Sequence, residues 1–175
     1  FLERKMQEQD SAGGVIECIV KGMPAGIGEP VFDKLDANLA KAVMSIGAVK
    51  GVEIGDGFAV AGAFGSDNND SFCKGQDGKI AKTTNHAGGI LGGMSDGSDI
   101  ILRAAIKPTP SIARQQQTVN RDGEDIEISI KGRHDPIIVP RAVVVVEAMT
   151  AICVLDMILL GMTSRLDRIQ EFWKK

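Results

Sequence analysis

The sequence predicts an α+β fold in which antiparallel sheets are layered against helices. Between residues 32 and 46, apolar side chains recur every three or four positions, the period of a helix with one buried face. Ile126, Ile128 and Ile130 alternate with polar residues, the period of a half-buried strand. Residues 142–162 form a long apolar run typical of a buried or half-buried helix. Strand and helix patterns in one chain of 175 residues indicate layers of both.

The first third of the chain predicts a helix, a strand and a second helix. Residues 1–9 look like the end of a helix and include no initiator Met at position 1, so we expect the chain to be a fragment. Residues 13–21 are β-rich and predict a strand. Pro30 suits the first turn of the second helix. The expected buried face of that helix consists of Phe32, Leu35, Leu39, Val43 and Ile46.

The middle of the chain predicts strands separated by loops. Residues 58–64 are expected to form a strand, the polar and turn-rich residues 65–78 a loop, and residues 98–107 another strand. Residues 111–131 predict a hairpin, because Asp122-Gly123 favours a tight turn.

The last third predicts one long helix from Arg141, with Gly161 as a potential break. A membrane span is disfavoured because Glu147 and Asp156 would be costly inside a bilayer. Residues 164–175 are charged and are expected to form a surface tail.

Composition excludes several classes of function. The net charge of −3 argues against a general nucleic-acid-binding protein, which would be basic. Three distant cysteines and two histidines offer no metal-ligand spacing, so no metal site is expected. Thiols of this kind are typical of reduced, structural cysteines, and we expect a cytoplasmic protein without a membrane partner.

The stretch around Arg133, His134 and Asp135 is the most informative motif. Pro136 keeps the preceding residue extended, so the three polar residues lie in a connection between a strand and a helix. Arginine supplies a planar fork for phosphate, and aspartate supplies a base or an acceptor. Taken alone, such a stretch is more often a solvated charged loop, and Arg133 and Asp135 could also form a structural ion pair.

Three further blocks carry residues suited to a ligand. The Gly-rich residues 83–95 allow backbone N–H groups to approach an anion or a flat ring, although a tight turn, capped by Asn85 and His86, has the same composition. Residues 107–111 place a lysine beside hydroxyl groups on a stretch stiffened by proline, which suits a phosphate as well as a solvated strand end. Gly47-Ala48 gives clearance for a flat ligand or a helix C-cap.

Together with residues 26–35, and in this order, these blocks closely resemble the C-terminal half of chorismate synthases, over about residues 13–161. The resemblance implies helices packed between antiparallel sheets in a homotetramer. It implies a lyase of the shikimate pathway and aromatic amino-acid biosynthesis, which converts 5-enolpyruvylshikimate-3-phosphate to chorismate with reduced FMN. The family is also associated with NADP.

The resemblance also assigns residues. It implies that Asp135 is the catalytic base that deprotonates the flavin. The implied flavin contacts are Gly47, Ala48, Gly92, Lys107, Pro108, Thr109, Pro110, Ser111 and Arg133.

The chain departs from the family in ways that affect activity. Gly47 replaces a residue that is commonly polar, and Ile137 stands where cysteine is frequent. The two catalytic histidines of the family belong to its N-terminal half, and neither His86 nor His134 matches them. We therefore expect residues 1–175 to be a single region that is inactive alone. The alternative is a non-catalytic structural or assembly domain that keeps the fold and binds no flavin.

Overall fold

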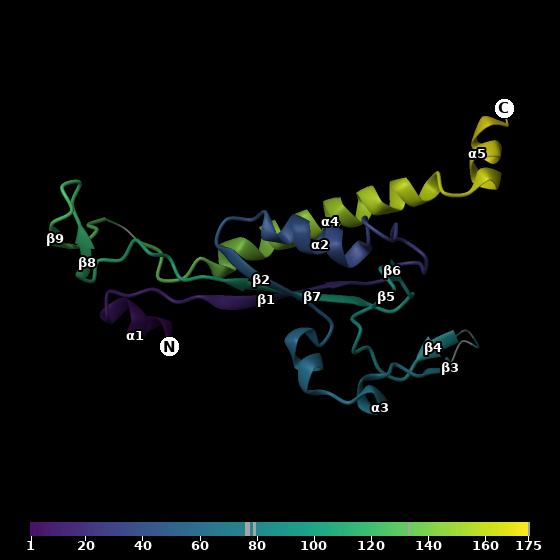
Figure 1. Cartoon of the computed structure of the whole chain (residues 1–175), viewed down its shortest axis with the longest axis horizontal. Helices are drawn as coiled ribbons and strands as arrows, with labels where there is room; N and C mark the ends of the chain where they lie inside the picture. Colours follow the sequence, from purple (N-terminus) through teal and green to yellow (C-terminus); the bar gives the residue numbers. More distant parts are fainter. Residues whose placement is uncertain (76–77, 79, 133, 175) are drawn as a thin grey trace.

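A three-stranded antiparallel sheet forms the centre of the molecule (Figure 1). The computed structural model describes residues 1–75, 78, 80–132 and 134–174. The sheet has the order β1-β7-β2, with strands Gly14–Val20, Ile100–Ile106 and Val49–Ile54. In β1 and β7, side chains alternate between a buried and a more exposed face, as the pleat of a strand requires.

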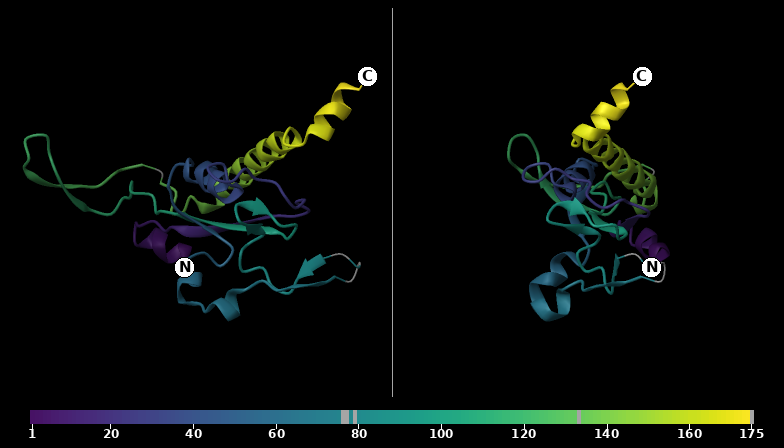
Figure 2. Two further views of the ribbon diagram at one scale, coloured as in Figure 1. Left: turned by 45° about the vertical axis from the view of Figure 1, so that its right-hand side comes forward. Right: turned by 90° about the vertical axis from the view of Figure 1, so that its right-hand side faces the viewer.

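Two helices cover the buried face of the sheet. Helix α2 (Leu35–Met44) packs on β2, and helix α4 (Val139–Met162) packs on β1 and on α2. Both lie on the same side of the sheet (Figure 2). The core between these layers contains Leu35, Leu39, Val43, Ile100, Leu102 and Val146, all fully buried. The predicted α+β arrangement of antiparallel strands against helices is confirmed.

The remaining elements are short and extend from this core (Figure 1). They are α1 (Leu2–Gln7), η1 (Gly57–Gly62), α3 (Gly65–Asn68), β3 (Phe72–Lys74), β4 (Ile80–Lys82), β5 (Ile90–Leu91), β6 (Met94–Ser95), β8 (Gln116–Val119), β9 (Asp125–Ile128) and α5 (Leu166–Trp173). Consecutive strands pair as three separate hairpins, β3–β4, β5–β6 and β8–β9. The hairpin predicted around Asp122-Gly123 is therefore confirmed, with Val119 opposite Asp125.

Several local predictions were wrong. Residues 58–64 do not form a strand, because Gly55 and Gly57 take φ values of 58° and 55° and turn the chain out of the sheet into η1. The expected loop 65–78 contains α3 and β3. The C-terminal tail lies on the surface, as predicted, but it forms helix α5.

The second helix also differs from its prediction. It begins at Leu35, whose N–H donates to the Gly93 carbonyl at 2.8 Å. Pro30 belongs to a preceding loop closed by paired backbone bonds between Glu29 and Asp33. Phe32 therefore falls outside the helix and is 92% exposed, although its spacing predicted a buried position.

Helix α4 is apolar on more sides than the chain covers. By length and composition alone, this helix is sufficient to cross a membrane. One face, with Val146, Thr150 and Met157, is buried in the core, which favours a core helix. The opposite surface exposes Val144, Ile152, Leu155 and Leu159. The expectation of a buried or half-buried helix thus holds for one face only.

The β8–β9 hairpin leaves Ile126, Ile128 and Ile130 exposed, contrary to the half-buried prediction, because it projects beyond the sheet (Figure 1).

The boundary of α2 leads to a stability prediction. Leu39→Ala removes a fully buried side chain and should lower the free energy of unfolding by about 2–5 kcal/mol. The matched variant Phe32→Ala truncates an exposed ring and should change it by less than about 0.5 kcal/mol. Urea denaturation followed by circular dichroism measures both. Equal losses would contradict the placement of Phe32 outside the helix face.

Candidate functional site

Two of the predicted ligand blocks meet at one end of the sheet. Residues 107–111 continue directly from the end of β7, and Gly47-Ala48 precede β2 beside them. The N–H of Lys107 donates to the Ala48 carbonyl at 2.9 Å, which extends the pairing of the two strands by one step. The structure therefore brings Lys107 and Ala48 together, although 59 positions separate them (107 − 48).

The backbone at Gly47-Ala48 is accessible to a ligand. A Cβ built on Gly47 would meet no atom within 4 Å, so this peptide faces open space. Ala48 has a φ of 71°, a left-handed conformation that side chains other than glycine rarely adopt. The turn that follows α2 thus presents main chain, with little side-chain obstruction, beside Lys107.

The loop of residues 134–136 lies at the same end of the sheet. The N–H of Ala12, just before β1, donates to the Pro136 carbonyl at 2.8 Å. The hydroxyl of Ser11 donates to the Thr109 carbonyl at 2.6 Å. The two blocks that the sequence predicted separately are therefore both attached to residues 11–12.

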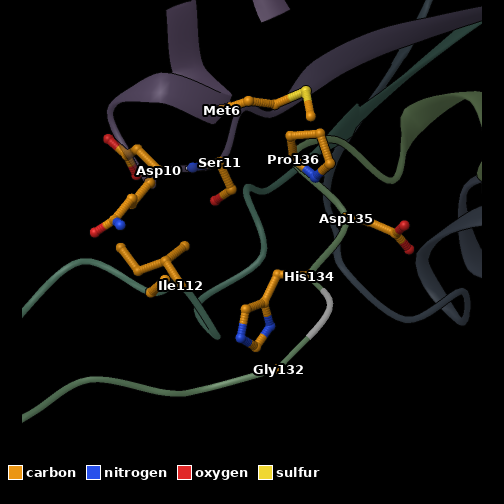
Figure 3. A pocket seen from close by; sticks show the side chains of 10 residues that line it. Met6, Asp10, Ser11, Ile112, Gly132, His134, Asp135 and Pro136 are labelled. Atoms are coloured by element: carbon orange, nitrogen blue, oxygen red, sulfur yellow. Dashed lines mark hydrogen bonds between the residues drawn. The ribbon is translucent and has the colours of Figure 1, made fainter. Parts of the chain in front are cut away.

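A small cavity lies between this loop and the residues that follow α1 (Figure 3). Its volume is about 180 Å³. The imidazole of His134 lies beside Ile112 in this view, and its Nε2 is 2.8 Å from the Ile130 carbonyl oxygen. The lining residues are Met6, Gln9, Asp10, Ser11, Ile112, Ala113, Gly132, His134, Asp135 and Pro136.

Asp135 is positioned by an ion pair rather than by the cavity. Its carboxylate points away from His134 (Figure 3), and Oδ2 lies 2.6 Å from Nη1 of Arg141. Arg141 belongs to the first turn of α4, which Pro140 helps to begin. The other oxygen, Oδ1, has no hydrogen-bond or ion-pair partner in the part of the chain that the structure describes. One carboxylate oxygen of Asp135 is therefore positioned, and the other is available to a bound group.

Residues 107–111 have unused capacity to bind an anion. The hydroxyl oxygen of Thr109 is withdrawn from solvent and has no hydrogen-bond partner among the described residues. The Lys107 side chain is exposed, and it makes no ion pair with any residue the structure describes. A phosphate group accepts hydrogen bonds from both kinds of donor. This segment therefore fits the phosphate of a flavin nucleotide.

One predicted contact, Gly92, lies away from this place. Gly92 and Gly93 form the two-residue turn of the β5–β6 hairpin, with φ values of 59° and 88°. This turn contacts the start of α2, whereas Ala48 follows the end of that helix. The ten residues of α2 place its two ends about 15 Å apart. Arg133 lies outside the residues that the structure describes.

The Gly-rich run is a network of turns held by buried charges. Asp70 accepts hydrogen bonds from the Thr84 hydroxyl and from the N–H groups of His86 and Ala87, at 2.7–2.9 Å. Lys82 makes a short ion pair with Asp96 and lies 4.0 Å from Asp70. At most 7% of each of these three charged side chains is exposed.

The turn-capping interpretation of Asn85 is confirmed, and His86 has a partner within the protein. The Asn85 side chain accepts from the Gly89 N–H at 2.7 Å and donates to the Asp99 carbonyl at 2.8 Å. His86 Nδ1 is 2.6 Å from Oδ2 of Asp56.

The hydrogen bonds set the protonation of Asp70. Burial by itself would raise the pKa of this carboxyl. The donated hydrogen bonds and the Lys82 ammonium outweigh burial, so the pKa of Asp70 lies below its ordinary value of 3.8. For Asp96, the hydrogen bonds from Lys82 and Ser98 likewise outweigh burial and lower the pKa.

Sequence reasoning missed Ser11, Arg141 and the cluster of Asp70, Lys82 and Asp96. Ser11 stands beside a turn and makes its contact 98 positions away, which no local pattern signals. Arg141 follows the recognised motif by a few residues, so its closeness to Asp135 was available from the sequence. The charged cluster joins segments 12–26 positions apart (82 − 70 and 96 − 70), and only tertiary structure brings them together.

Comparison with known proteins identifies the family to which this chain belongs. The family model described as chorismate synthase matches residues 1–159. A chorismate synthase of Lachnoclostridium phytofermentans is 65% identical over 175 residues, which are the whole chain and 48% of that relative. One from Archaeoglobus fulgidus is 62% identical over 154 residues, 87% of this chain and 42% of the relative.

A solved structure supports the same assignment. A crystal structure of chorismate synthase superposes with a TM-score of 0.75 at 30% identity, covering 97% of this chain and 44% of that one. The chain thus spans about half the length of the curated relatives it matches.

The Asp70 network leads to a prediction for acid stability. Because the pKa of Asp70 is lowered on folding, its contribution is present above about pH 4 and is lost as the pH falls through the folded pKa. Asp70→Asn should lower stability at pH 7 by about 1.5–3 kcal/mol and flatten the loss of stability in acid. Thermal melting between about pH 2 and 7 measures both effects.

The control for this prediction is Asp125→Asn on the exposed strand β9. It should leave the pH profile of the melting temperature unchanged. Identical profiles for the Asp70 variant and the parent would show that the buried hydrogen bonds do not stabilise the fold.

Proposed function

Because the chain belongs to the chorismate synthase family, we propose that it is the flavin- and phosphate-binding half of such an enzyme. The parent enzyme would be a lyase that converts 5-enolpyruvylshikimate-3-phosphate to chorismate and phosphate by anti-1,4 elimination. The observation that carries this proposal is the meeting of residues 107–111, Gly47-Ala48 and residues 134–136 at one end of the sheet.

The proposed cofactor is reduced FMN, which supplies electron density to the allylic system of the substrate when it is bound. Lys107 and the hydroxyl of Thr109 would hold its phosphate, because both are donors without partners among the described residues. Gly47 and Ala48 would give the ring clearance. Pro108, Pro110, Ser111, Gly92 and Arg133 remain proposed contacts, by resemblance to the family.

Asp135 is the proposed base. Its Oδ2 is held by Arg141, and its Oδ1, which has no partner among the described residues, would take up the proton. The Arg141 guanidinium holds one oxygen of this carboxylate in place at 2.6 Å. Arg141 is 74% exposed in this chain, so water weakens that effect unless the remaining half of the enzyme covers the pair.

The exposed apolar surface of α4 is consistent with a protein of greater length. Val144, Ile152, Leu155 and Leu159 are 52–63% exposed on one helix. Burial of each such side chain contributes about 1.5–3 kcal/mol, so a second layer packed here would stabilise the assembly strongly. We propose that the remaining half of the family's length provides this layer, within a cytoplasmic homotetramer. The alternative of a non-catalytic assembly domain would use the same surface without binding flavin.

Titration of FMN into this chain, completed by the remaining half of the Lachnoclostridium phytofermentans relative, tests the proposal. Lys107→Ala should weaken FMN binding by about tenfold, because it removes a charged donor to phosphate. Fluorescence quenching of the flavin measures the dissociation constant, and the loss should shrink at high salt. Lys21→Ala, on an exposed lysine after the far end of β1, serves as the matched control.

If the completed protein without substitutions binds no FMN, the assembly domain is favoured instead. Equal affinities of the Lys107 and Lys21 variants would remove Lys107 from the site while leaving the cofactor in place.

Asp135→Asn should affect turnover more than binding. The amide keeps the shape of the side chain but is not a base, so turnover should fall by about 10²–10⁴-fold. The assay is anaerobic chorismate formation with reduced FMN, in this chain completed by the remaining half of the Lachnoclostridium phytofermentans relative. The chain alone should show no turnover. Asp122→Asn, in the hairpin turn, is the control, and an unchanged rate for the Asp135 variant would leave that residue a purely structural partner of Arg141.

A further inference from the structure

The stretch from Ser11 to Gly13 lies between the two blocks of the proposed flavin site. On one side, the Ala12 N–H donates to the Pro136 carbonyl at 2.8 Å, and Ala12 pairs with Ile137 as an isolated parallel bridge. On the other side, the Ser11 hydroxyl donates to the Thr109 carbonyl at 2.6 Å. Ala12 itself is buried. A stretch of three residues thus contacts residues 107–111 and the loop 134–136 at once.

Gly13 allows the start of residues 107–111 to lie directly against the main chain that precedes β1. A Cβ at this position would lie 2.4 Å from the Ile106 carbonyl oxygen and 3.1 Å from Cδ of Pro108. Its neighbour Gly14 is opposite Ile106 in the β1–β7 register. Any side chain at position 13 would therefore push the start of the 107–111 segment away from β1.

The Ser11 hydroxyl is held in a defined orientation. The N–H of Ser11 donates to Oδ1 of Asp10 at 2.8 Å. The Asp10 carboxylate also lies 3.8 Å from the cationic groups of Lys5 and Arg114. Ser11 is therefore held at its N–H by Asp10 and at its hydroxyl by the Thr109 carbonyl. Its contact with the Thr109 carbonyl fixes the peptide between Thr109 and Pro110, next to the Thr109 hydroxyl, which has no partner among the described residues.

We propose that Ser11 is a positioning residue that sets the spacing between the phosphate-binding segment 107–111 and the loop that carries Asp135. This inference rests on the proposed flavin site and deepens it. The hydroxyl acts through Thr109 and touches neither cofactor nor substrate. Without it, the Thr109 carbonyl loses its donor, and the segment is free to turn away from Ala48 and from the loop.

The test uses this chain completed by the remaining half of the Lachnoclostridium phytofermentans relative. Ser11→Ala should raise the dissociation constant of FMN by about 3- to 10-fold, as the loss of one hydrogen bond predicts. Ser11→Thr keeps the hydroxyl and should restore binding to within about twofold of the parent. The control is Ser164→Ala, whose hydroxyl also donates to a main-chain carbonyl, that of Gly161, at an exposed site.

Hydrogen exchange without ligand separates this inference from the proposed function. Ser11→Ala should increase amide exchange in peptides covering both residues 107–113 and residues 134–138, and Ser164→Ala should increase neither. Unchanged exchange in both peptides, or a threonine variant as weak as the alanine variant, would overturn the positioning role. If the parent binds no FMN while exchange still responds to Ser11→Ala, the coupling of the two segments stands and the flavin site is refuted.

Discussion

Every part of the candidate site depends on the burial of β7 between β1 and β2. Ile100, Leu102 and Ala104 of this strand are fully buried against α2 and α4, so the central strand has little freedom to shift. The Gly-rich turns enter β7 at its start, and residues 107–111 leave it at its end. The positions of both blocks are consequently set by the same pairing and the same core. The loop of residues 134–136, which carries the proposed base, is attached indirectly, through the start of β1 and the first turn of α4.

The two ends of β7 are held by different physical means. At the start, buried charges and main-chain donors fix the turns around Asp70, Lys82 and Asp96, with nearly all solvent excluded. At the end, the Thr109 hydroxyl and Oδ1 of Asp135 have no partner among the residues that the structure describes. Buried polar groups are normally satisfied inside a finished structure. An end of the sheet with spare donors and acceptors is therefore the place where a ligand contributes most.

The exposed surface of α4 links the fold to the length of the relatives. A helix with apolar residues on nearly every side is stable in water when both faces are covered, and here α2 and the sheet cover one. The curated relatives are about twice as long as the chain, and the proposed cover of the other face is the part of their length that this chain does not match. The same addition would lower the effective dielectric around the Asp135–Arg141 pair and strengthen their interaction.

The sequence by itself determined the α+β class, the strands around β1 and β7, the hairpin at Asp122-Gly123 and the family, because these depend on local periodicity and on motifs in a fixed order. It also located Asp135 and residues 107–111 as candidates. Tertiary structure decided which faces are buried: Phe32 and Leu35 share one helical spacing, yet only Leu35 reaches the core. It also decided that Gly92 lies far from Ala48, and that Ser11 contacts Thr109 across 98 positions. Contacts between distant segments depend on how the layers pack, and no local pattern in the sequence records that packing.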